Sequence, residues 1–191
     1  MLHDKSILRQ TILQQRQSLS TEQWQIKSRQ ICDRLKSLPL LQQAETIFAY
    51  FSFRQEPDLS PLFSMPKNWV FPRCVNKSLE WHLWQPKEPL ALNRYGIPEP
   101  LNTSPKISPK KADLILVPTV AVSFKGYRLG YGGGFYDRLL SSPECSITPN
   151  ISIVFNYGLI KSVPIESWDM KMNFVCTETL FRSFESNQLD Y

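Results

Sequence analysis

Cysteine and histidine are scarce in this 191-residue sequence, and neither is grouped as a metal or nucleophile site would require. The two histidines, His3 and His82, have no metal-ligand spacing and no adjacent cysteine or serine motif, so we expect both to be structural. The four cysteines form no CxxC pair, which argues against a thiolate zinc site and a disulfide framework. We expect reduced thiols at all four positions: Cys32, Cys74, Cys145 and Cys176.

Long apolar runs are also absent. The opening MLHDKSILRQ lacks the apolar stretch of a signal peptide. The longest apolar run, LILVPTVAV at 114–122, is far shorter than the ~20 residues that a membrane-spanning helix needs. We therefore predict a soluble, cytoplasmic protein without a membrane partner.

Length and charge set broad limits on the organisation of the chain. A chain of 191 residues can bury one core but is short for two, so we predict a single domain over residues 1–191, acting as a monomer. The net charge of +5 favours anionic partners such as nucleotides, polycarboxylates or nucleic acid, without choosing among them.

The pattern of apolar residues predicts helices first and strands afterwards. Apolar residues recur at helical spacing from Leu2 to Leu19, and Ser20 with Gln23 can form a capping box for a second helix running toward Leu38. Runs rich in β-branched and aromatic residues predict strands at TIFAYFS, NWVFPRC, LEWHLWQ, DLILVPTVAV and ISIVF.

The continuous apolar run LILVP suits a strand that is buried on both faces of a parallel sheet. We therefore predict an α/β fold with three layers, in which helices flank a mostly parallel, Rossmann-like sheet. Trp81 and Trp84 are expected in the core or a pocket wall. Residues 88–111 hold five of the fifteen prolines, which predicts an irregular surface connection.

Glycine is scarce except in one place. Five of the seven glycines lie in the first nine residues of GYRLGYGGGFYDR, the stretch from Gly126 to Arg138. The cluster follows a predicted buried strand and precedes a predicted helix whose Phe135, Leu139 and Leu140 would face the core. Such a loop lets the backbone approach a ligand, and the first free N–H groups of the helix would point at it. An anion, best a phosphate, fits this arrangement.

The glycine spacing matches no standard nucleotide fingerprint, since it is neither a Walker loop nor G-x-G-x-x-G. Arg128 adds a charged fork that can bridge phosphate oxygens, and Asp137 can hold a hard cation. The alternative is a glycine-rich turn that only joins a strand to a helix, with Arg128 solvated and Asp137 favourably placed on the helix dipole. Spacing alone does not decide between them.

The segment LILVPTVAVSFKGYRLGYGGGFYDR resembles the nucleotide loop of the 5-formyltetrahydrofolate cyclo-ligase family, also called 5,10-methenyltetrahydrofolate synthetase. KSILR near the start is similar to the family's K-x-x-[LM]-R, although such a pair of basic residues is usually a solvated helix face. The resemblance implies a catalytic role for Arg128. It also implies ATP binding by Lys5, Ser6, Ile7, Leu8, Arg9, Arg128, Leu129, Gly130, Tyr131, Gly132, Gly133, Gly134, Phe135 and Tyr136.

Two further segments carry the resemblance. FSFRQEPDL at 51–59 is similar to the family's folate-contacting segment, which implies that Phe51 and Glu56 bind substrate together with Tyr131 and Phe135. From the residues alone, Glu56 can also be a plain surface glutamate. YGIPEP at 95–100 resembles a family segment, which implies that these residues form a wall of the pocket. IESWDMKMNFVCTE at 165–178 resembles the closing segment, which implies Mg²⁺ ligands at Asp137 and Asp169.

The sequence departs from the family pattern at several positions. Members commonly read V-P-G-x-A-F-D before the glycine loop. In this chain Thr119 replaces the glycine of that pattern, Val122 the phenylalanine and Ser123 the aspartate. Ser123 would thereby remove a carboxylate close to the phosphate site. Asn173 stands where an aspartate is frequent, and Phe135 replaces a frequent tyrosine. We expect altered metal affinity from these changes rather than loss of activity.

The resemblance implies ATP- and Mg²⁺-dependent closure of 5-formyltetrahydrofolate to 5,10-methenyltetrahydrofolate, with ADP and phosphate released through a phosphorylated formyl intermediate. Two other classes stay open. One is a folate-binding protein without turnover, which is favoured only by the departures from the family pattern at Thr119 and Ser123. The other is a basic RNA-binding module, suggested by the isoelectric point of about 9.0 and the segment PKISPKK. No RNA-binding signature supports the latter, so we expect no nucleic-acid partner.

Overall fold

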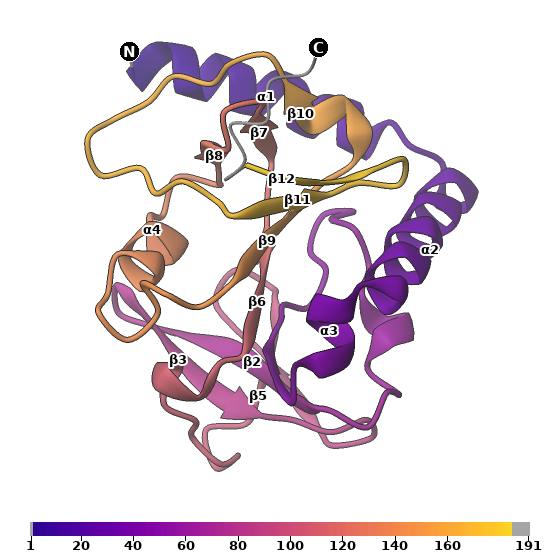
Figure 1. Cartoon of the computed structure of the whole chain (residues 1–191), viewed down its shortest axis with the longest axis vertical. Helices are drawn as coiled ribbons and strands as arrows, with labels where there is room; N and C mark the ends of the chain where they lie inside the picture. Colours follow the sequence, from indigo (N-terminus) through magenta and orange to yellow (C-terminus); the bar gives the residue numbers. More distant parts are fainter. Residues whose placement is uncertain (1, 185–191) are drawn as a thin grey trace.

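The structure is a computed structural model that describes residues 2–184, with side chains described from Lys5 onward. It has a mixed α/β architecture (Figure 1). The α-helices are α1 (Leu2–Gln17), α2 (Thr21–Ser37), α3 (Pro39–Gln43) and α4 (Phe135–Leu140). Short 3-10 turns lie at η1 (Ser60–Leu62), η2 (Pro109–Lys111) and η3 (Asn156–Gly158).

A seven-stranded sheet runs through the middle of the molecule (Figure 1). Its five inner strands are parallel, and the strand at each edge is antiparallel to its neighbour. In spatial order the strands are β12 (Phe181–Ser183), β11 (Phe174–Cys176), β9 (Asn150–Ile153), β6 (Leu114–Pro118), β1 (Thr46–Phe48), β2 (Asn68–Val75) and β3 (Ser78–Leu83).

The central strand β6 is packed on both faces, as its continuous apolar sequence predicts. Leu114 and Leu116 belong to the cluster that contains the buried side chains of α2, whereas Ile115 and Val117 belong to the cluster with Leu139 and Leu140 of α4. Helices α2 and α3 accordingly lie on one side of the sheet and α4 on the other (Figure 1). The predicted three-layer α/β fold is confirmed.

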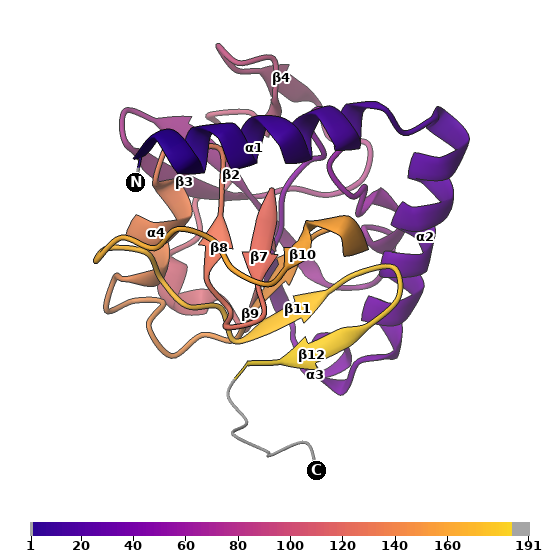
Figure 2. The same cartoon turned by 90° about the horizontal axis from the view of Figure 1, so that it is seen from above.

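A small second sheet carries the long N-terminal helix. Its order is β10 (Leu159–Ile160), β7 (Ala121–Ser123) and β8 (Arg128–Leu129). Figure 2, seen from above, shows α1 lying across this sheet. The apolar face of α1 supplies Leu8, Ile12 and Leu13 to the cluster that includes Val120 and Leu129. Lys5, Arg9 and Arg16 lie on the same buried side of α1, so this packing also places them beside the segments described below.

Two predictions about strands need correction. DLILVPTVAV is not one strand, because β6 ends at Pro118, which has no N–H, and β7 begins only at Ala121 in the other sheet. The proline-rich stretch is not wholly irregular either, since β4 (Leu90–Leu92) and β5 (Pro98–Pro100) pair as an antiparallel hairpin. The Asn93 side chain closes its turn by accepting hydrogen bonds from the backbone N–H groups of Tyr95 and Ile97.

The aromatic and histidine predictions hold where the structure describes them. Trp81 is buried and stacks on Phe48, with ring centroids 4.3 Å apart, and Trp84 packs in the core. His82 is fully buried with its Nδ1 2.7 Å from the Ser104 carbonyl oxygen. The side chain of His3 lies outside the described part. All four cysteines are free thiols, and no helix of residues 2–184 has the length and apolarity to span a membrane.

The predicted capping box at the start of α2 is present and gives a stability prediction. The Gln23 N–H donates to Ser20 Oγ, and the Ser20 N–H donates to Gln23 Oε1, each at 3.1 Å. Ser20→Ala removes one of these bonds and leaves an orphan N–H, so we expect a loss of about 1 kcal/mol in the free energy of unfolding by urea. Gln25→Ala, at an exposed position of the same helix, is the control. Equal stability of both variants would contradict a working cap.

Candidate active site

A cavity of about 900 Å³ opens where the parallel strands β1 and β6 end. Tyr50 and Phe51 follow β1 into its wall, and Pro118 closes β6 there. Ligands of parallel α/β sheets bind at this edge, because the loops that follow the strands converge on it. The β4–β5 hairpin adds Tyr95, Ile97, Pro98 and Glu99, so the predicted pocket wall at 95–100 does line the cavity.

Most of the residues singled out in the sequence line this one cavity. They are Lys5, Arg9, Phe51, Glu56, all of residues 128–136, Asp137 and Asp169. Ser6, Ile7 and Leu8 do not line it. Helical periodicity explains this difference, because Lys5 and Arg9 share one face of α1 while Leu8 faces the small sheet and Ser6 and Ile7 are exposed.

The glycine loop follows β8, not the buried strand directly, and two of its glycines have left-handed backbones. Gly132 has φ +101° and Gly134, which precedes α4, has φ +64°. A Cβ atom on Gly132 would lie 3.5 Å from the Arg9 guanidinium, whose Nε donates to the Gly130 carbonyl at 2.8 Å. A side chain at Gly132 would therefore strain the turn through its positive φ, although its Cβ would meet Arg9 only at an ordinary contact distance.

Helix α4 differs from the prediction in two respects. It has only six residues, so its dipole and its set of free N–H groups are small. Leu139 and Leu140 face the core as predicted, but Phe135 is half-buried and lines the cavity. The positive character of the site therefore comes mainly from side chains.

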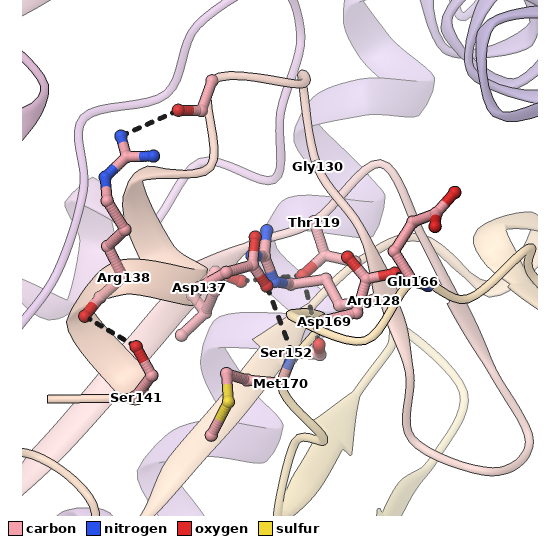
Figure 3. A network of polar contacts seen from close by, with 12 residues as sticks. Thr119, Arg128, Gly130, Asp137, Arg138, Ser141, Ser152, Glu166, Asp169 and Met170 are labelled. Atoms are coloured by element: carbon pink, nitrogen blue, oxygen red, sulfur yellow. Dashed lines mark hydrogen bonds and ion pairs between the residues drawn. The ribbon is translucent and has the colours of Figure 1, made fainter. Parts of the chain in front are cut away.

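Arg128 is buried in the wall of the cavity and held by two partners. Its guanidinium donates to Asp137 Oδ2 at 2.9 Å (Figure 3). It also lies 5.7 Å from the centre of the Tyr136 ring. The other oxygen of Asp137 accepts a long contact from the Met170 N–H at 3.5 Å. The Nε–H of Arg128 is buried without a hydrogen-bond partner among the described residues. Arg128 is thus a fixed cation rather than a solvated one.

Lys5 forms an ion pair with Asp169, which also accepts from the Glu166 N–H at 2.7 Å. The pair ties the start of α1 to the loop before β11. Within residues 5–184, no three His, Cys, Asp or Glu side chains gather as a metal site would need. Asp137 and Asp169 line the same cavity, but each already pairs with a cation: Asp137 with Arg128, and Asp169 with Lys5.

Glu56 is buried, so the reading of it as a plain surface glutamate is wrong. Its Oε2 accepts from the Phe53 N–H at 3.1 Å, in a turn where Arg54 and Gln55 have positive φ of 48° and 56°. Such conformations are costly for residues other than glycine and often mark a functional turn. Burial raises the pKa of Glu56 to about 7, against the lowering effects of Arg16, the Phe53 N–H and the Tyr131 hydroxyl.

Some residues of this region were missed in the sequence. The cavity is also lined by Tyr50, Phe53, Arg54, Arg94, Glu166 and Trp168. Arg16 lies behind the lining, in contact with Tyr131. Its spacing was a usable signal, because positions 5, 9 and 16 fall on one face of a helix. Arg54 and Arg94 carried no signal, since only the turns that hold them bring them to the cavity.

Three departures from the family pattern have structural explanations. Thr119 is buried and donates to the Val117 carbonyl and Ser152 Oγ, each at 3.1 Å (Figure 3). Ser123 accepts from the Tyr127 N–H at 3.1 Å in the turn between β7 and β8 and is not among the residues that line the cavity. Asn173 exchanges two 3.0 Å hydrogen bonds with Asn150 across β9 and β11.

Fold and cavity together define a class: an α/β protein with a cationic, glycine-lined pocket at the carboxyl edge of its parallel sheet and a buried carboxyl group in the same pocket. The profile of the 5-formyltetrahydrofolate cyclo-ligase family matches residues 2–178. The chain belongs to this family of enzymes.

Individual relatives agree with this assignment. The chain is 30% identical to the 5-formyltetrahydrofolate cyclo-ligase of Escherichia coli (strain K12) over 177 residues, which cover 87% of this chain and 96% of the relative. It is also 30% identical to that of Mycolicibacterium smegmatis, covering 91% and 93%. The solved 5,10-methenyltetrahydrofolate synthetase of Aquifex aeolicus superposes with a TM-score of 0.85 at 29% identity, covering 98% of this chain and 96% of that one.

The raised pKa of Glu56 predicts a measurable pH dependence of stability. The folded chain binds a proton more tightly at Glu56 than the unfolded chain, whose glutamate pKa is about 4.3, so stability is lost as pH rises from there through about 7. Glu56→Gln removes this loss. We expect the variant to gain about 2–3 kcal/mol on the parent between about pH 4.5 and pH 8 in urea unfolding. The exposed Glu144→Gln is the control. A pH-independent difference for Glu56→Gln would refute the raised pKa.

Proposed function

We propose that this chain closes 5-formyltetrahydrofolate to 5,10-methenyltetrahydrofolate with ATP as the co-substrate, releasing ADP and phosphate. Family membership supports the reaction. The observation that carries it for this chain is that one cavity holds both a cationic glycine-rich wall and a buried carboxyl group beside aromatic rings.

The ATP half of the proposed site is built from the glycine loop and α1. Lys5, Arg9 and Arg128 supply three cations to this wall, and the exposed backbone of Gly132 and Gly133 permits close approach of phosphate oxygens. Partial burial lowers the pKa of Arg9 somewhat, but a guanidinium stays charged at neutral pH. Phosphates would compete for Lys5 with Asp169, which holds the ammonium in place beforehand.

The folate half of the proposed site is centred on Glu56 and Phe51. Phe51 stacks on Phe71 with centroids 4.0 Å apart, so its ring is a rigid part of the wall. An ionised Glu56 has two acceptor oxygens for adjacent N–H donors of a pterin ring. Tyr131 and Phe135 line the cavity on the side of the glycine loop and are proposed to contact both ligands.

The chemistry asks the protein for positioning and for charge stabilisation. In the proposed sequence the formyl oxygen attacks the γ-phosphorus of ATP, and the bond to ADP breaks. N10 then adds to the formyl carbon and loses its proton, and the carbon–oxygen bond breaks to release phosphate. Arg128, fixed by Asp137 and Tyr136, is placed to stabilise charge on the phosphoryl group without first reorganising.

The donor set fits a Mg²⁺ ion that arrives with ATP. Mg²⁺ is usually held by one or two carboxylates together with substrate phosphates and water, and Asp137 and Asp169 line the cavity where phosphates are proposed. Because both already pair with cations, we propose them as partial ligands and not as a preformed metal site. Bound there, the ion would neutralise charge on the phosphate oxygens.

Neither alternative function gains support. Thr119 and Ser123, which encouraged a binding protein without turnover, lie outside the cavity lining and have structural partners. The basic segment at Lys110 and Lys111 forms the turn η2 and does not line the cavity. We therefore propose a small-molecule substrate, with no nucleic-acid partner.

A coupled assay tests the reaction and the role of Arg128 together. We expect methenyl-folate absorbance to rise in equal proportion to ADP release, and Arg128→Ala to lower kcat by about 10²-fold with little change in folate affinity. Arg182→Ala, an exposed arginine on β12, is the matched control and should turn over normally. Turnover of Arg128→Ala within twofold of the parent would show that the phosphoryl group lies elsewhere.

Separate ligand titrations test the two halves. Glu56→Gln should weaken 5-formyltetrahydrofolate by roughly tenfold to a hundredfold, because one charged hydrogen-bond acceptor is lost, while ATP binding is kept. The double variant Lys5→Ala with Arg9→Ala should show the mirror pattern. If Glu56→Gln binds the folate as tightly as the parent, the pterin does not lie at Glu56, whatever the glycine loop binds.

A further inference from the structure

Arg16, in the last turn of α1, is a buried cation that the reaction described above does not use. Only 3% of the residue is exposed. Its guanidinium donates to the Tyr131 hydroxyl, and its central carbon lies 5.4 Å from the centre of the Tyr131 ring. Its Nε–H has no hydrogen-bond partner, and no carboxylate pairs with it, among the described residues. A buried cation in this state needs a nearby negative charge.

Glu56 is the group that can supply this charge. It is 4% exposed, and Arg16 is the foremost influence that favours its ionised form. Tyr131 links them in space: its oxygen accepts from Arg16, and its ring centre lies 6.4 Å from that of Phe53, whose N–H donates to Glu56 Oε2. The Tyr131 hydroxyl also lowers the pKa of Glu56. Accepting a bond from Arg16 leaves the phenol proton free to point at Glu56.

The other groups that face Glu56 do not compete for this role. Tyr50 follows β1, and Tyr136 belongs to α4. Burial raises the pKa of both phenols, and also that of Tyr131, so all three are neutral when Glu56 titrates. The Phe53 N–H contributes one neutral hydrogen bond. Arg16 is therefore the charged side chain that most affects the ionisation of Glu56.

We propose that Arg16 is a positioning residue for the folate half of the site: it holds Tyr131 in place and increases the fraction of Glu56 that is ionised at neutral pH, which is the form that accepts hydrogen bonds from the pterin. This inference rests on the proposed function. It adds a residue outside the cavity lining, acting from α1, which otherwise serves the ATP half. One helix then supplies cations to both halves of the site.

The first test needs no ligand. Carbon-13 NMR of glutamate carboxyl groups, with the Glu56 signal assigned by its loss in Glu56→Gln, follows the titration of Glu56 directly. We expect Arg16→Met to raise the midpoint by about one pH unit or more, since it removes the opposite charge and keeps the apolar bulk. Arg16→Lys should return it toward the parent value, and Arg29→Met, on the exposed face of α2, should leave it unchanged.

The second test measures folate affinity across pH with the same variants. Because the ionised fraction limits binding, Arg16→Met should weaken 5-formyltetrahydrofolate by about fivefold to tenfold near pH 7, and the loss should vanish well above the new midpoint. ATP affinity should stay within about twofold. If Arg16→Met does not fold by circular dichroism, Tyr131→Phe takes its place, and it too must raise the Glu56 midpoint.

The outcomes separate this proposal from the proposed function. An unchanged Glu56 midpoint in Arg16→Met, or a loss of folate affinity that is equal at every pH, overturns the role of Arg16. A raised midpoint without a pH-dependent loss of folate affinity overturns it as well, and shows that the pterin does not bind at Glu56. Parent-like folate binding by Glu56→Gln in the same experiment identifies that second case.

Discussion

The docking of α1 against the glycine loop is the constraint on which the rest of the site depends. Three cationic side chains of this helix reach two other segments: Arg9 binds the Gly130 carbonyl and Arg16 binds Tyr131 in the glycine loop, whereas Lys5 pairs with Asp169 before β11. The helix can present all three because Leu8 and Ile12, on the same buried side, anchor it to the small sheet. Losing this packing would remove Lys5 and Arg9 from the cavity lining and Arg16 from behind it.

The charges of the site are arranged before any ligand arrives. Arg128 is held by Asp137, and Lys5 is held by Asp169, so neither cation has to be ordered when phosphate binds. Preorganised charge of this kind is more effective than mobile charge, because no reorganisation is needed during the reaction. The cost is carried by the surrounding fold, which keeps Arg128 and Arg16 buried, each with an Nε–H that has no hydrogen-bond partner among the described residues.

The departures from the family pattern change the supports of the site more than its lining. Thr119 and Ser123 satisfy backbone and side-chain groups around the ends of β6 and β7, and Asn173 joins β9 to β11. At positions 123 and 173, where the family commonly has aspartate, Ser123 and Asn173 form local hydrogen bonds that a buried carboxylate could form only at a desolvation cost. The glycine loop and its arginine are unchanged by these substitutions.

The sequence by itself determined the fold class, the capping box and the glycine loop, because apolar periodicity, turn chemistry and glycine content are local properties. The other segments that line the cavity were indicated by the resemblance to the family. The sequence did not reveal the break after Pro118 or the hairpin held by Asn93, which depend on pairing between distant strands. Tertiary structure also decided which residues at the start of α1 reach the site. It turns Lys5 and Arg9 toward the cavity and leaves Ser6 and Ile7 outside. The burial of Glu56 beside Arg16 was decided in the same way, because desolvation and charge pairing exist only once separate segments have packed together.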